Sequence, residues 1–493
     1  MKKYLVLLLG VIVVVFIIYS VRAQDKPGFD RYFLDATMRI DYYHAGHNQE
    51  EIVTLDRIYR QGVWAGPVKN LIDPFNRGRY CARVYDAASG QLLYARAFDS
   101  LFGEYRTTDE ALKGIRRTFH ESVLIPYPKN KIIFTLEARD RQNNFYKIFS
   151  QEIDPASIYI VREKTEPGVK VYELVKNGSP HDKVDVVFLA EGYTTGEETK
   201  LQKDLERFVR VFFSLEPYKS LKDKFNIYGV FKPSAESGCD EPSHGQFKQT
   251  ALGCSFDSFG SERYLLTEDN RRVRDTAAAA PYDALLIMVN HARYGGGGIY
   301  NLYCTFTTDN QWYEYLMLHE FGHSFTGLAD EYYTSQVAYN EFYPRGVEPV
   351  EPNITALLDP TNLKWRNLVT PGVAIPTPWE KEEFDRMDTA YQKVRMEVNE
   401  RIARMKREGA PKEEIARLEE ESERLSAEQA RKVDDFLARS KFAGKVGAFE
   451  GAGYSSTGLY RPAVDCIMFT KGKKPFCPVC EEAVRRMIEF YCR

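Results

Sequence analysis

Hydrophobic and polar positions follow a strand-like pattern over the first part of the chain, residues 25–154. Short segments rich in Tyr, Phe, Val and Ile are interrupted by polar residues at 38–42, 51–55, 80–85 and 131–137. Such alternation is typical of strands with one buried face, and turn residues such as Ala88-Ser89-Gly90 separate the segments. The pattern predicts an N-terminal all-β sandwich, which we assign to residues 24–165 and interpret as a support or adhesion module.

The pattern changes after residue 170, where continuous apolar runs replace the alternation. Residues 184–190, 226–231 and 284–290 are typical of strands buried on both faces, whereas residues 201–215 repeat apolar side chains with a helical period. Strands alternating with helices predict an α/β (α+β) domain, which we assign to residues 166–493. The chain lacks a Walker sequence and a G-x-S-x-G motif, so nucleotide hydrolysis and α/β-hydrolase chemistry are not indicated.

A third pattern covers residues 379–440. Apolar side chains recur every three or four residues on two stretches, and Gly409-Ala410-Pro411 separates them. This arrangement predicts an antiparallel helical hairpin inserted into the second domain. Its dense Glu, Lys and Arg residues indicate solvated faces, and the alternative is an arm that docks a partner.

The first residues have the organisation of a secretory signal. Lys2 and Lys3 precede an apolar run over residues 5–18, and Val21-Arg22-Ala23 offers a cleavage site. We therefore assign residues 1–23 to a signal peptide. The alternative is an uncleaved anchor, and the apolar run is short for a membrane span. After its removal no membrane span is expected, and the protein should be secreted, periplasmic or on the surface of a bacterium.

Composition narrows the possible functions. The 493 residues contain 67 basic and 70 acidic side chains, a net charge of −3, which argues against a nucleic-acid-binding protein. A hydrophobic content of 44% argues against global disorder. The chain is therefore expected to be a globular protein with several domains.

Eight cysteines fit an oxidising compartment. Cys239 and Cys254 could close a small loop, and the C-terminal cysteines are clustered at 466, 477, 480 and 492. A structural zinc site at Cys477-Pro-Val-Cys480 is the alternative to disulfides. We favour disulfides because a four-thiolate site needs a second pair with matching spacing.

One helical segment, residues 313–325, carries the pattern of a metal site. It contains His319-Glu320-Phe321-Gly322-His323, and histidines four residues apart lie on the same face of a helix, so both can reach one metal ion. Glu320 lies beside the first histidine and could take a proton from a water bound by that metal. The sequence therefore predicts a catalytic zinc site.

A third ligand is expected shortly after the helix. Asp330 would lie roughly 16 Å beyond His319 if the helix continued, but Gly327 can adopt the left-handed conformation that ends a helix and turns the chain back. Two histidines, one carboxylate and an open position are typical of catalytic zinc. Glu331 is the alternative ligand, and otherwise it would support a ligand by a hydrogen bond.

With these residues the chain resembles the IgA peptidase family, secreted bacterial zinc metalloendopeptidases with a zincin-type, metzincin-like catalytic domain behind a β-sandwich. The resemblance rests on His319-Glu-x-Gly-His323 and on Leu328-Ala-Asp330-Glu331-Tyr332. It continues in Glu191-Gly-Tyr-Thr, Ser234-Ala-Glu-Ser-Gly238, Glu450-Gly-Ala-Gly-Tyr454, Gly458-Leu-Tyr-Arg-Pro462, Asp465-Cys-Ile-Met468 and Phe476-Cys-Pro-Val-Cys480. These segments cover most of the chain outside the helical insertion.

The resemblance implies that His319, His323 and Asp330 bind one Zn²⁺ ion and that Glu320 is the general base. It also implies that Met468 belongs to a methionine turn, a hydrophobic floor beneath the metal. The spacing departs from the ordinary metzincin motif, because Gly327 comes one position late and Asp330 replaces the third histidine.

The oxyanion of the reaction needs a further hydrogen-bond donor. Tyr454 or Tyr460 is a candidate, because metzincin-like enzymes often place a tyrosine near the metal. The alternative for both is a role in packing.

The expected function is that of a secreted zinc endopeptidase. Its substrate would be an extracellular protein or peptide, and immunoglobulin or another glycoprotein is what the family name suggests. The alternative is a surface adhesion or binding protein with an idle or structural metal site. The presence of Glu320 favours the peptidase, because a binding module does not need a general base.

Overall fold

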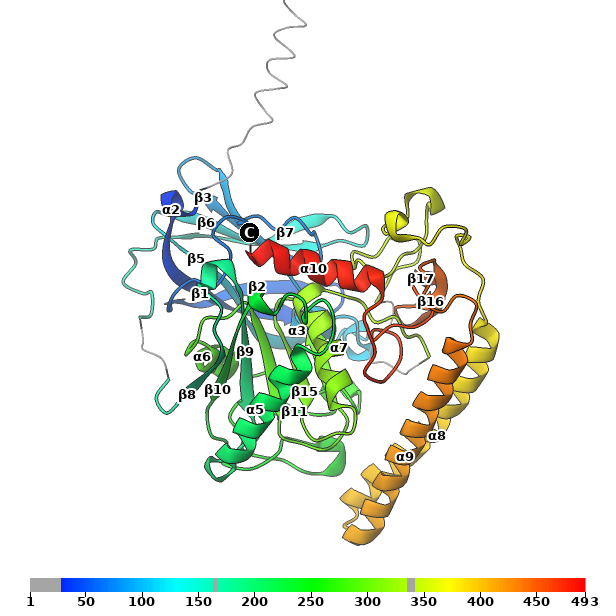
Figure 1. The fold of residues 1–493 in the computed structure, drawn as a ribbon. Helices are drawn as coiled ribbons and strands as arrows, with labels where there is room; N and C mark the ends of the chain where they lie inside the picture. The colour runs from blue at the N-terminus through cyan, green and yellow to red at the C-terminus, as the bar shows by residue number, and fades with distance from the viewer. Residues whose placement is uncertain (1–27, 163–165, 335–341, 493) are drawn as a thin grey trace, which may run out of the picture.

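The computed structural model describes residues 28–162, 166–334 and 342–492 (Figure 1). The predicted signal peptide, residues 1–23, lies outside the described residues. None of the described helices combines the length and the apolar composition that crossing a membrane requires.

The N-terminal region forms two antiparallel sheets, as its alternating pattern predicts. One has the order β2-β1-β5, and its strands are Phe33–Gly46 (β1), Glu51–Arg60 (β2) and Arg117–Pro128 (β5). The other has the order β4-β3-β6-β7, with Tyr80–Asp86 (β3), Leu92–Phe98 (β4), Ile132–Arg139 (β6) and Phe145–Ile153 (β7). Buried side chains of both sheets, such as Ile40 and Phe134, belong to one hydrophobic cluster, which also packs the short helices Phe29–Tyr32 (α2), Leu101–Tyr105 (α3) and Asp109–Leu112 (α4).

A six-stranded sheet forms the centre of the rest of the molecule, with the order β14-β15-β13-β9-β10-β8. The four inner strands are parallel to one another, and both edge strands run antiparallel to their neighbours. The predicted buried strands are all present. The bounds are Lys170–Val175 (β8), Val184–Glu191 (β9), Phe225–Phe231 (β10), Ala284–Val289 (β13), Gly296–Ile299 (β14) and Tyr303–Thr307 (β15).

The two faces of this sheet are covered by different parts of the chain. On β9, Val186 and Phe188 point into a cluster with the helices Glu198–Phe212 (α5), Tyr313–Thr326 (α7) and Pro478–Cys492 (α10). Val187 and Leu189 point the other way, into the cluster of the N-terminal sheets and the helix Asn270–Ala277 (α6). The run from Val186 to Ala190 is therefore continuously apolar, because the N-terminal region covers one face of this strand and the helices cover the other.

The predicted helical hairpin consists of Lys381–Arg407 (α8) and Lys412–Ala438 (α9), joined at Gly409 in the left-handed conformation. Figure 1 shows the pair as a long arm at one side of the molecule. Phe384 and Leu437 at its base are buried in the core beside α7. The remaining described strands form two short hairpins, Cys254–Ser255 (β11) with Leu266–Thr267 (β12) and Phe449–Ala452 (β16) with Ser455–Arg461 (β17).

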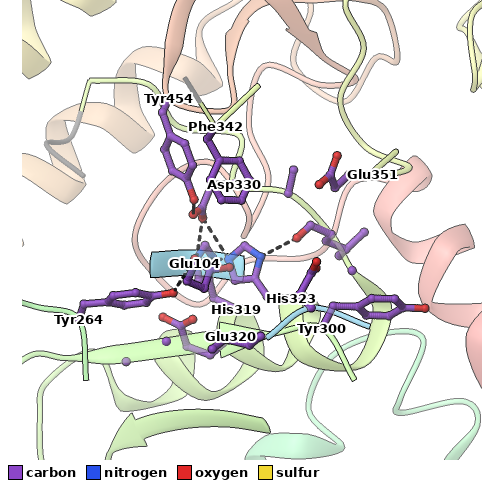
Figure 2. A pocket seen from close by; sticks show the side chains of 18 of the residues that line it. Glu104, Tyr264, Tyr300, His319, Glu320, His323, Asp330, Phe342, Glu351 and Tyr454 are labelled. Atoms are coloured by element: carbon purple, nitrogen blue, oxygen red, sulfur yellow. Dashed lines mark hydrogen bonds and ion pairs between the residues drawn. The ribbon is translucent and has the colours of Figure 1, made fainter. Parts of the chain in front are cut away.

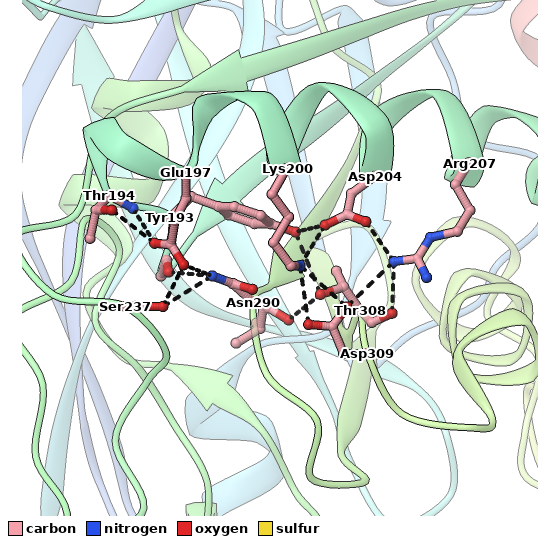
Figure 3. Close-up of polar contacts among 12 residues, drawn as sticks. Tyr193, Thr194, Glu197, Lys200, Asp204, Arg207, Ser237, Asn290, Thr308 and Asp309 are labelled. Carbon is pink, nitrogen blue, oxygen red and sulfur yellow. Dashed lines mark hydrogen bonds and ion pairs between the residues drawn. The ribbon is translucent and has the colours of Figure 1, made fainter.

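The segments Glu191-Gly-Tyr-Thr and Ser234-Ala-Glu-Ser-Gly238 hold the chain where β9 leads into α5. Gly192 has φ +72°, and an added Cβ would lie 2.1 Å from the Gly238 carbonyl oxygen, so only glycine fits there. Beyond it, Figure 3 shows a polar network along α5, in which the Tyr193 hydroxyl donates to Asp204 at 2.8 Å and Asn290 donates to Glu197 at 3.1 Å. The network fixes the start of α5 on the sheet.

The prediction of disulfides is wrong for this structure. All eight cysteines lie in the described part of the chain, and none is bonded to another. Cys239 and Cys254 are buried as separate thiols in the core. The spacing of the cysteines therefore did not indicate pairing.

Candidate active site

Helix α7 positions the first three site residues. Its histidines at 319 and 323 are one turn apart, so both imidazole rings project from the same side, and Glu320 lies beside them (Figure 2). The helix ends at Gly327, which has φ 66° and ψ 39°, the left-handed conformation expected from the sequence. The chain then turns back and brings Asp330 over the two rings.

Three potential ligand atoms converge above α7. The Oδ1 atom of Asp330 lies 3.0 Å from Nε2 of His319 and 3.1 Å from Nε2 of His323, and the two Nε2 atoms are 3.1 Å apart. A tetrahedral zinc ion with bonds of about 2.0–2.1 Å would hold such atoms about 3.3 Å apart. The residue types and spacing therefore fit a metal ion, and His319, Glu320 and His323 form one group that could hold one.

Backbone carbonyls hold both histidine rings from behind. Nδ1 of His319 lies 3.0 Å from the Ile467 carbonyl oxygen, and Nδ1 of His323 lies 2.6 Å from that of Leu328. With Nδ1 donating its hydrogen to a carbonyl, each ring presents the lone pair of Nε2 to the site. These contacts orient the rings for ligation.

Burial and the neighbouring charges together shift the pKa values of the residues in this cluster. Burial alone would lower the pKa of His323, but the Asp330 carboxylate raises it to about 9. Burial works against ionisation of Asp330, yet His323 and His319 hold the pKa of this carboxyl well below its usual value. For Glu320, burial raises the pKa and the two histidines offset part of that rise. The site therefore holds a carboxylate ready to bind a cation and a second carboxylate with a heightened affinity for protons.

The edge strand β14 passes close to α7 and lines the same pocket, a cavity of about 120 Å³. An added Cβ at Gly296 would lie 2.8 Å from Oε1 of Glu320, and one at Gly298 would lie 2.4 Å from the Glu320 carbonyl oxygen. Glycine therefore permits the close approach of the strand to the helix. This run of glycines therefore forms an edge strand of the central sheet rather than a flexible turn.

Of the two tyrosine candidates, only Tyr454 lies at the site. Its hydroxyl donates to Oδ2 of Asp330 at 2.6 Å (Figure 2). Tyr460 lies on β17, where its backbone pairs with Thr355, and it does not line the pocket. The suggestion that Tyr460 stabilises the oxyanion is therefore wrong, because the short β16–β17 hairpin carries the two tyrosines to different places.

Glu331 and Met468 lie behind the ligand cluster. The Glu331 carboxylate is fully buried and accepts hydrogen bonds from Asn353 and Cys480, so it points away from the two histidines. Met468 is fully buried too, and its sulfur would lie 3.1 Å from a Cβ added at Gly322, on the inner side of α7. The backbone links the two residues, since the Glu331 N–H donates to the Met468 carbonyl at 2.8 Å.

Several pocket residues were missed in the sequence. Glu104, from the N-terminal region, lies in the pocket beside Tyr264, whose hydroxyl contacts it at 3.3 Å. Arg263 also lines the pocket and donates to the Tyr332 hydroxyl at 3.1 Å. The sequence could have indicated Tyr332, because it lies in the family-like segment directly after Asp330. It gave no indication of Glu104, because the N-terminal region was interpreted as a support module.

Comparison with known proteins identifies the family. The family model described as IgA Peptidase M64 matches residues 172–488, and the model of the Peptidase M64 N-terminus matches residues 28–150. No curated protein gives a significant match to the chain. Together the two family models cover most of the chain and both sides of the pocket. The chain therefore belongs to the IgA peptidase M64 family and is a peptidase.

Proposed function

We propose that the protein is a secreted zinc-dependent endopeptidase, in which His319, His323 and Asp330 bind the metal and Glu320 is the general base. The observation that carries the proposal is the convergence of the two Nε2 atoms and Oδ1 within 3.1 Å of one another. Family membership favours this function over the alternative of an adhesion protein with an idle metal site. Secretion is supported by the signal-like sequence of residues 1–23.

The arrangement also supports a metzincin-like catalytic domain. Both histidines come from one helix, the third ligand follows a glycine turn, and Met468 packs beneath the helix. A zinc ion bound by these residues would activate a water molecule and polarise the scissile carbonyl of a peptide. The substrate is proposed to be an extracellular protein or peptide.

The protein's own residues would carry the proton and stabilise charge. Glu320 takes a proton from the attacking water and returns it to the leaving amine, and its raised pKa suits a group that must hold the proton between the two steps. The Tyr332 hydroxyl accepts a hydrogen bond from Arg263, and a phenol that accepts one can also donate one. We infer that the Arg263–Tyr332 pair faces the developing oxyanion, since both residues line the pocket.

The test compares two glutamates of the same helix. Glu320→Gln should bind zinc like the wild type but cleave peptides about 10²–10⁴-fold more slowly, because the base is lost. Glu314→Gln is the matched control, since Glu314 lies in the first turn of α7 and pairs with Lys473 at the surface. Cleavage is measured with a peptide library of unbiased sequence, and zinc by elemental analysis.

Two outcomes would contradict the proposal. In one, a zinc-loaded and folded wild type cleaves nothing in the library or in a panel of secreted proteins. In the other, Glu320→Gln retains wild-type activity, which would assign the base to another group.

A further inference from the structure

We propose a second metal site, separate from the first, in which Cys466, Cys477, Cys480 and Glu331 bind a structural zinc ion. One ligand atom from each of these four residues lies within 4.8 Å of all the others. Around a tetrahedral zinc ion with bonds of about 2.3 Å, sulfur atoms lie about 3.8 Å apart, so a small contraction completes the site. The four residues come from two separate parts of the chain and meet only in the fold.

The burial of the group points to a closed site. The exposed fractions are 0% for Glu331 and Cys480, 1% for Cys466 and 5% for Cys477. Exchange reactions of a redox-active Cys-x-x-Cys pair need an accessible sulfur, which this group does not offer. Four protein ligands with no open position are typical of structural zinc.

An unsatisfied carboxylate oxygen points to a cation. Oε1 of Glu331 accepts from Asn353 at 3.0 Å and from the Cys480 thiol at 3.2 Å. Oε2 is buried and has no hydrogen-bond partner among the described residues. A buried carboxylate oxygen without a partner is costly, and a bound cation would remove the cost. A disulfide between any two of the cysteines would leave Oε2 in the same state.

The surroundings suit a cluster of negative ligands. Cys477 directly precedes α10 and Cys480 lies in its first turn, where backbone N–H groups favour thiolates. The buried guanidinium of Arg461 attracts Glu331 electrostatically. Three thiolates with one carboxylate favour zinc over magnesium or calcium, because the sulfur ligands are soft.

The second site would stabilise the geometry of the first one. Glu331 follows Asp330 in the chain, and Cys466 precedes Ile467, whose carbonyl holds His319. A metal ion joining Glu331 and Cys466 would therefore tie together two segments that position the proposed catalytic ligands. The inference does not depend on the proposed function, because its ligands are different residues.

The test counts metal ions in the full chain. Elemental analysis should find two zinc ions per wild-type chain, one in the His319→Ala/His323→Ala double variant and one in Cys480→Ser. Cys492→Ser is the matched control, since Cys492 lies at the other end of α10, where its thiol donates to the Lys224 carbonyl at 3.6 Å. This control should keep both ions.

A second measurement does not need a cysteine variant to fold. Cobalt(II) bound to the His319→Ala/His323→Ala variant should show an intense near-ultraviolet thiolate-to-cobalt absorption. The three cysteines should also resist alkylation until a chelator is added. Absence of metal and of this absorption in the folded double histidine variant, or recovery of a disulfide among the three cysteines by mass spectrometry, would overturn the proposal.

Discussion

At the scale of single residues, the orientation of the proposed metal ligands depends on hydrogen bonds from neighbouring groups. Two carbonyls orient His319 and His323, and the Tyr454 hydroxyl holds Oδ2 of Asp330 at 2.6 Å. Each of these contacts leaves one atom of the ligand directed at the centre of the site. Such supporting hydrogen bonds strengthen metal binding in proteins, so they are expected to matter here.

Tyr454→Phe should weaken zinc binding. The variant keeps the ring but removes the hydrogen bond to Asp330, so we expect zinc affinity to fall about 10–100-fold. Competition with a chromogenic chelator measures the effect. Tyr460→Phe is the control, because Tyr460 does not line the pocket. Unchanged zinc affinity together with a lower kcat at saturating zinc would assign Tyr454 to the oxyanion instead.

At the scale of elements, strand β9 combines packing with buried charge. Its apolar residues serve two cores, while Asp185 near its start is fully buried. Oδ1 of Asp185 accepts from Asn226 at 2.9 Å, and the Asp283 carboxylate accepts from the Asp185 backbone N–H at 2.8 Å. Burial raises the pKa of Asp185 to about 7, although Asn226, Lys176 and His181 each lower it.

Asp185→Asn should change how stability depends on pH. The raised pKa means that the folded state favours the neutral form of Asp185. The contribution of the neutral acid to the stability of the fold is complete below pH ~4 and is lost as pH rises through about 7. Between pH 4 and 8 the free energy of unfolding of the wild type should therefore fall by roughly 2–4 kcal/mol relative to that of the variant. Chemical denaturation at several pH values measures the difference. The exposed Asp223→Asn is the control, and an equal pH dependence in wild type and Asp185→Asn would contradict the prediction.

At the scale of the whole molecule, the N-terminal β region is part of the folded core and of the pocket. It covers Val187, Leu189 and Ile287 on one face of the central sheet, and it places Glu104 in the pocket. Helix α10 lies between the two regions in Figure 1, and its Phe490 carbonyl accepts from Asn70 at 2.7 Å. The support function expected for this region is therefore combined with a contribution to the site.

Deletion of residues 28–162 should prevent correct folding of the remainder. The truncated chain would expose an apolar sheet face, and such patches lead to aggregation. We expect an insoluble product, or a soluble one that binds a hydrophobic dye and elutes as an aggregate in size-exclusion chromatography. Deletion of residues 1–27 alone is the control and should leave a soluble protein. A monomeric truncated chain with wild-type thermal stability would contradict the prediction.

Local patterns predicted much of this architecture. The strands β9, β10 and β13, the helix α7 and the hairpin α8–α9 follow from apolar periodicity, because burial on one or two faces imposes that periodicity directly. The left-handed Gly327 was also predictable, since a helix had to end before Asp330 could return. The prediction that the cysteines form disulfides was wrong. The spacing rule compares cysteines only with one another, so it does not consider that Glu331, from another segment, lies beside three of them.

The sequence by itself determined the helix, the His319/His323 pair and Glu320, because these residues are neighbours on one helical turn and local geometry suffices to relate them. Only the tertiary structure decided which side chains surround them. His319 meets the Ile467 carbonyl across 148 residues and Tyr454 meets Asp330 across 124, while Glu331 turns toward Cys480. Such contacts depend on how sheets, loops and α10 pack against one another, and no local period in the chain encodes that packing.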